Sequence, residues 1–149
     1  MLAKDIMRKP VCVLEEDTLE DVMKIMEREG VTGVVVQDAE GELKGILTER
    51  DFLKALVEPP HPTLALYGIF VVPEETLRKA FRDFKVLHAR DIMTKKVLTV
   101  DENATLEDIS SIMLHNNINH LPVLKGGRVI GMIERNDVLR AFLSERKSE

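Results

Sequence analysis

Three short motifs occur twice in the chain, in the same order and at a nearly constant offset. The pairs are DIM at 5–7 and 91–93, TLED at 18–21 and 105–108, and GILTERD at 45–51, which returns as GMIERND at 131–137. Repetition on this scale is typical of one supersecondary unit that has been duplicated. The chain therefore has to fold as two copies of one unit, and the differences between the copies are candidates for functional differences.

The local signals within each copy predict the order β-α-β-β-α. A β-branched run predicts an opening strand, at 11–14 in copy one and at 97–100 in copy two. TLED then forms a capping box, which predicts the start of a helix with one apolar face. Two strand-like runs separated by a glycine-containing turn predict a hairpin, at 31–47 and at 118–133. Helical spacing returns in TERDFLKALV and ERNDVLRAFL, so the expected fold class is α+β.

The repeats also predict the domain organisation. Copy one spans 1–57, copy two spans 89–145, and 146–149 form a tail. The intervening segment 58–88 has no counterpart, and its EPPHP sequence cannot continue a helix because proline lacks the backbone N–H. Pro73 can begin a helix, and the apolar spacing that follows predicts an extra amphipathic helix near 74–84. The sequence leaves two roles open for this helix, as a cap on the core or as a surface for self-association.

Composition narrows the classes of partner. The formal net charge is -5 and aromatic residues are only 4% of the chain, so neither a surface that follows the phosphate backbone of a nucleic acid nor a base-stacking platform is expected. The longest apolar run, Leu64 to Val72, is interrupted by Tyr67 and Gly68 and is far shorter than the roughly 20 residues that cross a bilayer. The N-terminus lacks the apolar segment of a secretory signal. We expect a cytoplasmic protein with no nucleic-acid or membrane partner.

The side chains that usually perform catalysis or bind metals form no recognisable group. Cys12 is the one cysteine, and His61, His88 and His115 show no metal-ligand spacing with it or with one another. No nucleophile has a plausible base and orienting group nearby in the sequence. We therefore expect no catalytic residue, no metal and no cofactor, and we expect that the chain is not an enzyme.

The ordered motifs resemble paired cystathionine-β-synthase (CBS) motifs, which are often called a Bateman module. The resemblance depends on DIM before a β-branched strand, TLED before an amphipathic helix, INHLPVL at 118–124, and the G-apolar-apolar-T-x-x-D pattern of GILTERD. It covers nearly all of the chain except 58–88 and the last few residues. The resemblance implies two β-α-β-β-α copies packed with pseudo-twofold symmetry, two clefts for adenine nucleotides or related adenosyl ligands, and homodimers.

The resemblance also implies roles for single residues. In the family, the aspartate that closes the pattern binds the ribose hydroxyls, and the Thr or Ser three residues before it faces the phosphates. Carried over by position, cleft one contains Ile46, Thr48, Asp51, Val97, Leu98, Ile118, Asn119 and His120. Cleft two contains Val11, Cys12, Val31, Thr32, Gly33, Met132, Glu134 and Asp137.

The two clefts differ in charge. Glu134 places a carboxylate where a hydroxyl should face phosphate, and Gly33 stands where copy two has His120, so electrostatics disfavours a polyanion in cleft two. We predict that cleft one is the nucleotide site and that cleft two is empty, weak, or suited to a ligand without a phosphate there.

Simpler interpretations of the same residues stay open. Thr48 and Asp51 also fit a helix-capping pattern, and Asp137 fits the preference for acidic residues in a first helical turn. His120 precedes an apolar strand and could be structural.

Two functions follow from these alternatives. The leading one is a free-standing regulatory module that binds AMP, ADP, ATP or S-adenosylmethionine and signals by conformational change. The alternative is a ligand-free scaffold that dimerises or docks a separately encoded enzyme or transporter.

Overall fold

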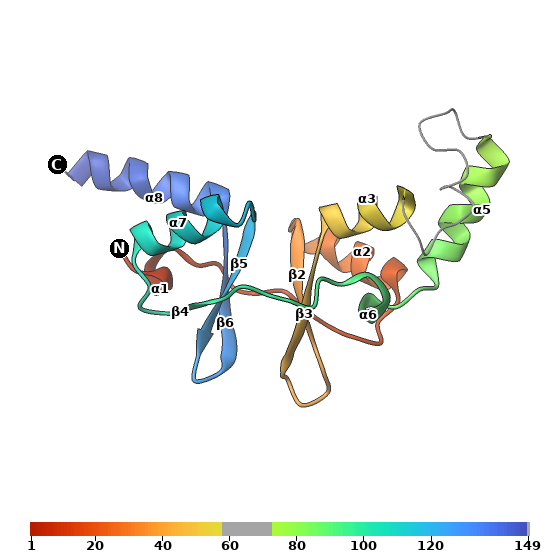
Figure 1. Ribbon diagram of the computed structural model, residues 1–149, viewed down its shortest axis with the longest axis horizontal. Helices are drawn as coiled ribbons and strands as arrows, with labels where there is room; N and C mark the ends of the chain where they lie inside the picture. Colours follow the sequence, from red (N-terminus) through yellow and green to blue (C-terminus); the bar gives the residue numbers. More distant parts are fainter. Residues whose placement is uncertain (58–72, 149) are drawn as a thin grey trace. The chain divides into compact units, whose positions relative to one another are not determined.

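The computed structural model describes residues 1–57 and 73–148, and this part of the chain divides into two compact units. Unit 1 combines Met1–Pro10 with the chain from Val97 onward, and unit 2 contains Val11–Lys96. The elements of unit 2 are β1 (Cys12–Leu14), α2 (Leu19–Glu29), β2 (Gly33–Gln37), β3 (Leu43–Thr48), α3 (Glu49–Val57), α5 (Glu74–Lys85) and α6 (Ala89–Ile92). Those of unit 1 are α1 (Ala3–Ile6), β4 (Val100–Asp101), α7 (Leu106–His115), β5 (His120–Lys125), β6 (Arg128–Glu134) and α8 (Arg135–Ser148) (Figure 1).

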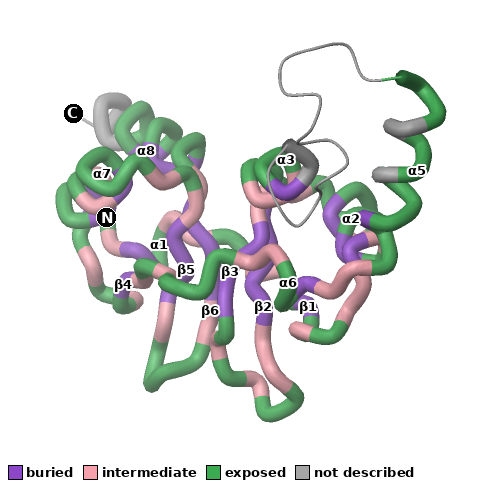
Figure 2. Tube along the Cα trace, turned by 45° about the vertical axis from the view of Figure 1, so that its right-hand side comes forward, coloured by how far each residue is buried: buried purple, intermediate pink, exposed green. Residues whose placement is uncertain are grey.

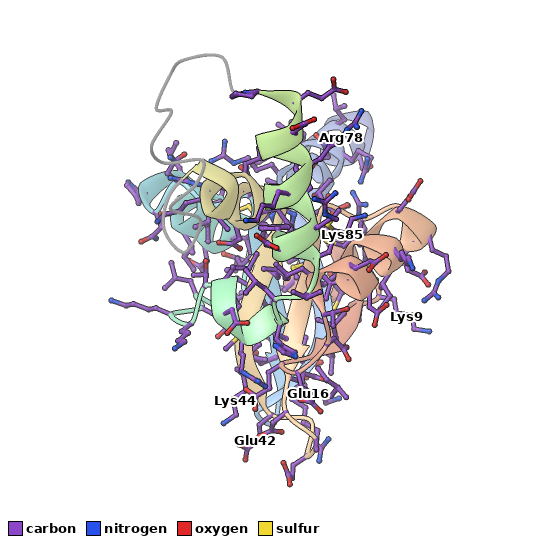
Figure 3. The ribbon with its side chains drawn as sticks, turned by 90° about the vertical axis from the view of Figure 1, so that its right-hand side faces the viewer. Lys9, Glu16, Glu42, Lys44, Arg78 and Lys85 are labelled. Carbon is purple, nitrogen blue, oxygen red and sulfur yellow. The ribbon has the colours of Figure 1, made fainter. Side chains whose placement is uncertain are left out.

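Each unit is built around a small mixed sheet, and the predicted β-α-β-β-α order is confirmed in both copies. In unit 2, β1 runs parallel to β2, and β2 pairs antiparallel with β3 through the hairpin. Unit 1 repeats this arrangement with β4, β5 and β6. Next to the turn of the first hairpin, the Lys44 Nζ atom is 3.6 Å from Asp38 Oδ2 and 3.8 Å from Glu42 Oε2 (Figure 3).

The threonine of each TLED motif caps the helix that follows it. The Thr18 hydroxyl accepts a hydrogen bond from the Asp21 amide at 3.2 Å, and Thr105 accepts one from Asp108 at 3.1 Å. Each helix then buries its apolar stripe against its own sheet (Figure 2). The fully buried side chains include Leu19, Val22 and Leu47 in unit 2, and Ile109, Leu121 and Ile133 in unit 1.

The compact units do not coincide with the repeats as they run along the sequence, because the DIM segments are exchanged. The Arg8 amide donates to the Met132 carbonyl at 2.9 Å, and the Met132 amide donates back at 3.0 Å, which joins the N-terminal segment to β6. Thr94 and Ile46 make the same reciprocal pair, at 2.9 Å in each direction, and join the segment after α6 to β3. The DIM segment of each copy therefore packs on the sheet of the other copy.

The exchanged segments explain why the motif glycines recur with the DIM methionines. A Cβ atom on Gly45 would lie 2.7 Å from the Met93 sulfur and 2.8 Å from the Thr94 carbonyl oxygen. A Cβ atom on Gly131 would meet the side chain of Met7 in the same way, with Cγ at 2.7 Å. Only glycine allows the segment to approach the strand this closely.

One predicted strand is shorter than expected. Copy two was expected to open with a strand at 97–100, but β4 contains only Val100 and Asp101. In copy one, the Val35 amide donates to the Val11 carbonyl at 2.9 Å and extends the parallel ladder. The matching residue in β5 is Pro122, which has no N–H to donate. The ladder of copy two therefore begins later.

The helix α5 lies in the segment where an extra helix was expected. Its Phe84 is only 3% exposed and belongs to the core of unit 2, where its ring centroid is 5.9 Å from that of Phe52. This packing is what a cap on the core requires. The EPPHP sequence at 58–62 lies outside the described residues, and α8 continues to Ser148 across most of the stretch assigned to a tail. Within 1–57 and 73–148, the helices are all too short or too polar to span a bilayer.

Candidate functional site

The T-x-x-D residues of copy one lie where β3 runs into α3. Thr48 is the last residue of the strand, and Asp51 lies in the first turn of the helix. The Asp51 Oδ2 atom accepts hydrogen bonds from the Thr48 amide at 2.9 Å and from the Thr48 hydroxyl at 3.4 Å. The carboxylate therefore fixes the helix start, and its other oxygen faces away from this local contact.

A third residue, Thr94, completes this group. Its hydroxyl donates to Asp51 Oδ1 at 2.8 Å, and its backbone is held by the reciprocal bonds with Ile46. The Asp51 carboxylate thus accepts hydrogen bonds from two neutral side-chain hydroxyls. Thr94 was not predicted as a site residue, although its position directly after the second DIM motif was a usable signal in the sequence.

The equivalent aspartate of copy two has charged partners. Asp137 Oδ1 accepts hydrogen bonds from Arg8 Nε at 2.7 Å and from Arg140 Nη2 at 2.6 Å. Its Oδ2 atom accepts one from the Glu134 amide at 2.8 Å. The Asp137 side chain is 5% exposed, so these bonds replace nearly all of its contact with water.

Arg8 stands where copy one has Thr94. Both residues directly follow a DIM motif, and both make the reciprocal backbone pair with the opposite hairpin strand. Arg8 Nη2 also lies 3.6 Å from Glu134 Oε2, and the hydrogen bond to Asp137 raises the pKa of Arg8. The exchange of Thr48 for Glu134 is therefore accompanied by an exchange of Thr94 for Arg8, so the added carboxylate meets an added cation.

His120 and Glu134 lie together in unit 1. They are opposite each other in the β5–β6 ladder, and His120 Nε2 is 3.6 Å from Glu134 Oε1. The His120 side chain is 10% exposed. His120 was expected in cleft one and Glu134 in cleft two, whereas the strand register makes the two residues neighbours.

The remaining predicted site residues are divided between the units. Unit 2 contains Ile46, Thr48 and Asp51 of cleft one, and Val11, Cys12, Val31, Thr32 and Gly33 of cleft two. Unit 1 contains Val97, Leu98, Ile118, Asn119 and His120 of cleft one, and Met132, Glu134 and Asp137 of cleft two. Gly33 pairs with Thr48 in the β2–β3 ladder, and the Thr32 carbonyl accepts from the Glu49 amide at 3.1 Å. Within each unit, the structure thus gathers the T-x-x-D residues with residues expected for the opposite cleft.

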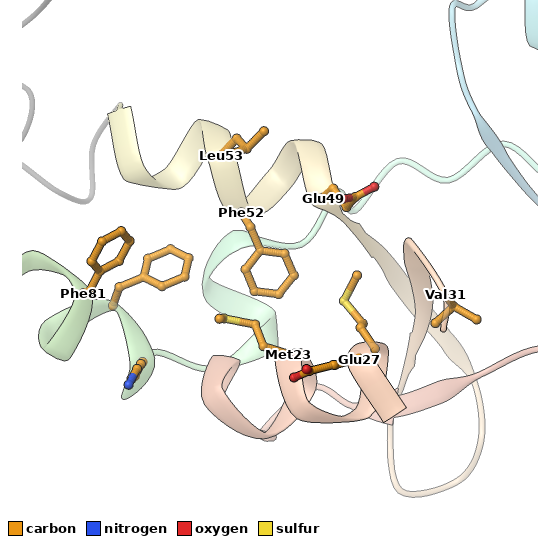
Figure 4. A pocket seen from close by; sticks show the side chains of 10 residues that line it. Met23, Glu27, Val31, Glu49, Phe52, Leu53 and Phe81 are labelled. Carbon is orange, nitrogen blue, oxygen red and sulfur yellow. The ribbon is translucent and has the colours of Figure 1, made fainter. Parts of the chain in front are cut away.

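Unit 2 also contains a pocket of about 360 Å³ between α2, α3 and α5 (Figure 4). Its lining is mostly apolar, with Met23, Phe52 and Phe81 among the side chains, and it includes Val31 from the residues expected in cleft two. Neither Thr48 nor Asp51 lines it, and Glu27 and Glu49 add carboxylates. Lys85 also lines it, so the charged part of the lining is mixed, and the pocket is distinct from the T-x-x-D group.

The side chains that commonly bind metals are dispersed in the described part of the chain. Among residues 1–57 and 73–148, no three His, Cys, Asp or Glu side chains are grouped so that they could hold an ion. The Cys12 thiol, which was assigned to cleft two, has its pKa raised by desolvation. A raised pKa keeps the thiol protonated and lowers its nucleophilicity near neutral pH.

Comparisons with known proteins agree with the duplicated fold. The family model of the CBS domain matches the sequence twice, at residues 3–58 and at residues 89–144. The uncharacterized protein MJ1426 of Methanocaldococcus jannaschii is 33% identical over an alignment 158 residues long, which covers 96% of this chain and 92% of that protein.

Solved structures extend the likeness to three dimensions. The CBS-domain containing protein ATU1752 from Agrobacterium tumefaciens matches with a TM-score of 0.76 and 26% identity, over 95% of this chain and 99% of that chain. CBSX2 from Arabidopsis thaliana, solved in complex with AMP, matches with a TM-score of 0.72 and 25% identity, over 97% of this chain and 98% of that chain. The protein described here therefore belongs to the CBS domain family and carries the domain as a tandem pair.

Proposed function

We propose that the chain is a regulatory module that binds an adenine nucleotide or a related adenosyl ligand and signals by conformational change, without catalysis. In this proposal Asp51 accepts hydrogen bonds from the two ribose hydroxyls, and the Thr48 hydroxyl faces the phosphate side. The AMP complex of CBSX2, a relative that this chain matches over almost its whole length, supports the ligand class.

The observation that carries the proposal is the neutral donor set around Asp51. The hydroxyls of Thr48 and Thr94 bond to its two oxygens, at 3.4 Å and 2.8 Å. Each such bond contributes only about 0.5–1.5 kcal/mol net, because water competes for both partners. A ribose diol supplies two hydroxyls of the same kind, so it can replace these donors without leaving the carboxylate unpaired. Exchanging the threonine hydroxyls for ribose hydroxyls therefore costs little free energy. Before ligand binds, the Asp51 carboxylate is already oriented by the Thr48 amide.

Signalling requires that the ligand bind one conformation better than another, because a ligand with equal affinity for both shifts nothing. AMP, ADP, ATP and S-adenosylmethionine share the adenosyl ribose that Asp51 would bind. They differ in the charge near Thr48, so their relative affinities report how that side of the site treats phosphate.

We further propose that the chain works as a homodimer. Leu53 on α3 and Leu139 on α8 occupy matching positions in the two copies and are 65% and 60% exposed. Phe142 and Leu143 add exposed apolar surface on α8. Such side chains favour burial against a second chain. The same surface also favours the alternative function, a ligand-free dimerisation or docking scaffold.

A thermal-shift assay separates the two functions. The purified chain is heated with AMP, ADP, ATP, S-adenosylmethionine or guanosine. A ligand at about 100 times its Kd adds about 2.7 kcal/mol to the stability of the folded state, which corresponds to about 5–11 °C for a chain of this size. We expect a shift with at least one adenosyl compound and none with guanosine.

Variants connect the shift to the site. Asp51→Ala should abolish it, whereas Asp83→Ala, which removes an exposed carboxylate from α5, should leave it unchanged. If no adenosyl compound produces a shift, the sensor function is wrong and the scaffold function is favoured.

A further inference from the structure

We propose that Arg8 determines which copy binds ligand, by occupying Asp137 and blocking the ribose position of copy two. This inference rests on the proposed function, because it concerns the same kind of site. It adds a consequence that the motif pattern does not contain: both copies keep the aspartate, yet only Asp51 is available to a ribose.

The contacts around the two aspartates differ in charge. Asp51 Oδ1 faces the neutral Thr94 hydroxyl at 2.8 Å, whereas Asp137 Oδ1 faces the Arg8 guanidinium at 2.7 Å. Hydrogen bonds between a guanidinium and a carboxylate are charge-assisted and are roughly twice as strong as those between neutral groups. A ribose hydroxyl therefore competes at Asp51 with the Thr94 hydroxyl, a donor of the same strength. At Asp137 it competes with the Arg8 guanidinium, which is a much stronger donor.

Burial adds to this difference. The Asp137 side chain is 5% exposed, so it depends on its protein partners for solvation. Displacing Arg8 by a neutral diol would leave a buried carboxylate with less compensating charge, which is unfavourable. At Asp51 the same exchange replaces a hydroxyl by a hydroxyl and changes no charge.

The backbone holds Arg8 in this position. Its amide and carbonyl both bond to Met132, at 2.9 Å and 3.0 Å, so the side chain starts from a fixed point beside β6. Glu134 Oε2 lies 3.6 Å from Arg8 Nη2 and attracts the same guanidinium. Because the guanidinium is preorganised, little entropy is lost when it binds Asp137.

Arg140 does not account for the difference between the copies. Its Nη2 atom also contacts Asp137, at 2.6 Å, but the side chain is 61% exposed. The matching position in α3 is Lys54, so both copies carry a cation there. Among the residues that hydrogen-bond to the two aspartates, the positions that change in character are 8 against 94 and 134 against 48, and these are the residues we assign to ligand choice.

Isothermal titration with AMP tests the inference. The wild-type chain should bind one AMP per chain. The variant Arg8→Thr/Glu134→Thr gives copy two the residues of copy one, and it should bind two AMP per chain. The Kd for AMP at copy two should be more than tenfold lower in this variant than in the wild type. Lys9→Thr is the matched control, because it removes an exposed cation next to Arg8 in the chain (Figure 3) and should leave one AMP per chain.

Two further variants address folding and assignment. Arg8→Gln keeps the length of the side chain and removes its charge, so it should expose a weaker second site if the double variant does not fold. The single variant Asp51→Ala should not bind AMP. Adding Arg8→Thr and Glu134→Thr to it should restore binding of one AMP per chain, at copy two.

The outcomes separate the two proposals. If the wild type, the double variant and Arg8→Gln each bind one AMP per chain, the role of Arg8 is overturned and the proposed function stands. Two AMP bound by the wild type, one of them lost in Asp137→Ala, would also overturn it. Absence of binding to wild type and variants alike would overturn the proposed function, and the inference with it.

Discussion

Replacing Gly45 by alanine should destabilise the chain by forcing the exchanged DIM segment away from β3. The new methyl group would lie 2.7 Å from the Met93 sulfur and 2.8 Å from the Thr94 carbonyl oxygen. The sulfur can move with its side chain, but the carbonyl is fixed because it accepts a hydrogen bond from the Ile46 amide at 2.9 Å. The backbone pair therefore has to shift or break.

The size of the effect follows from two opposing terms. Overpacking a close contact costs about 1–3 kcal/mol, and disturbing a backbone hydrogen bond adds about 1 kcal/mol. The lower entropy of the unfolded chain returns about 0.4–1 kcal/mol when alanine replaces glycine. We therefore expect a loss of about 1–3.6 kcal/mol in the free energy of unfolding, or a fall in Tm of about 2–14 °C.

Urea unfolding followed by circular dichroism measures this loss, and a double-mutant cycle identifies its cause. Met93→Ala removes the sulfur contact, so the double variant should recover about 0.5 kcal/mol or more of the loss from Gly45→Ala. Gly30→Ala is the control: its φ of 65° makes alanine costly, yet no atom lies within 4 Å of the added methyl group. It should show no coupling to Met93→Ala. A neutral Gly45→Ala would refute the packing of the second DIM segment on β3, whereas strict additivity with Met93→Ala would show that the Met93 contact contributes nothing to the loss.

Three smaller predictions concern the helix cap, the hairpin and the cysteine. Thr105→Ala removes the hydroxyl that caps α7 and should cost about 1 kcal/mol in urea unfolding; no change would mean that the cap does not stabilise the helix. Hydrogen bonds from the Glu42 and Glu40 amides lower the pKa of Asp38, so its charge stabilises the fold above the unfolded pKa of about 3.9 and ceases to do so as pH falls through the lower folded value. The stability difference between wild type and Asp38→Asn should therefore be constant near neutral pH and shrink in acid, and a difference independent of pH would contradict this. Desolvation raises the pKa of Cys12, so the pH midpoint of its alkylation by iodoacetamide should lie above that of a free cysteine, and an equal or lower midpoint would exclude the shift.

The repeated motifs were enough to predict the local structure. TLED marked both helix starts, and the hairpins and the α+β class followed from short-range patterns of turns and apolar residues. These features depend on contacts between residues close in sequence. The shortened β4 was missed because the effect of Pro122 appears only when its partner strand is known.

The exchanged DIM segments could not be predicted from local patterns, because they join residues that are far apart in the sequence, Arg8 with Met132 and Thr94 with Ile46. The residues of the candidate site were incompletely predicted for the same reason. Comparing the copies revealed the change from Thr48 to Glu134, but the matching change from Thr94 to Arg8 matters only once the segment packs beside the strand. The pairing of His120 with Glu134 likewise depends on strand register.

The central claim is that Asp51, and not Asp137, binds the ribose of an adenosyl ligand. The most direct test is calorimetric titration of AMP into Asp51→Asn and Asp137→Asn, two isosteric variants that remove the same charge from matching positions. We predict that Asp51→Asn weakens AMP binding at least tenfold and that Asp137→Asn leaves the Kd and the stoichiometry unchanged. Loss of AMP binding in Asp137→Asn with full retention in Asp51→Asn would contradict the claim.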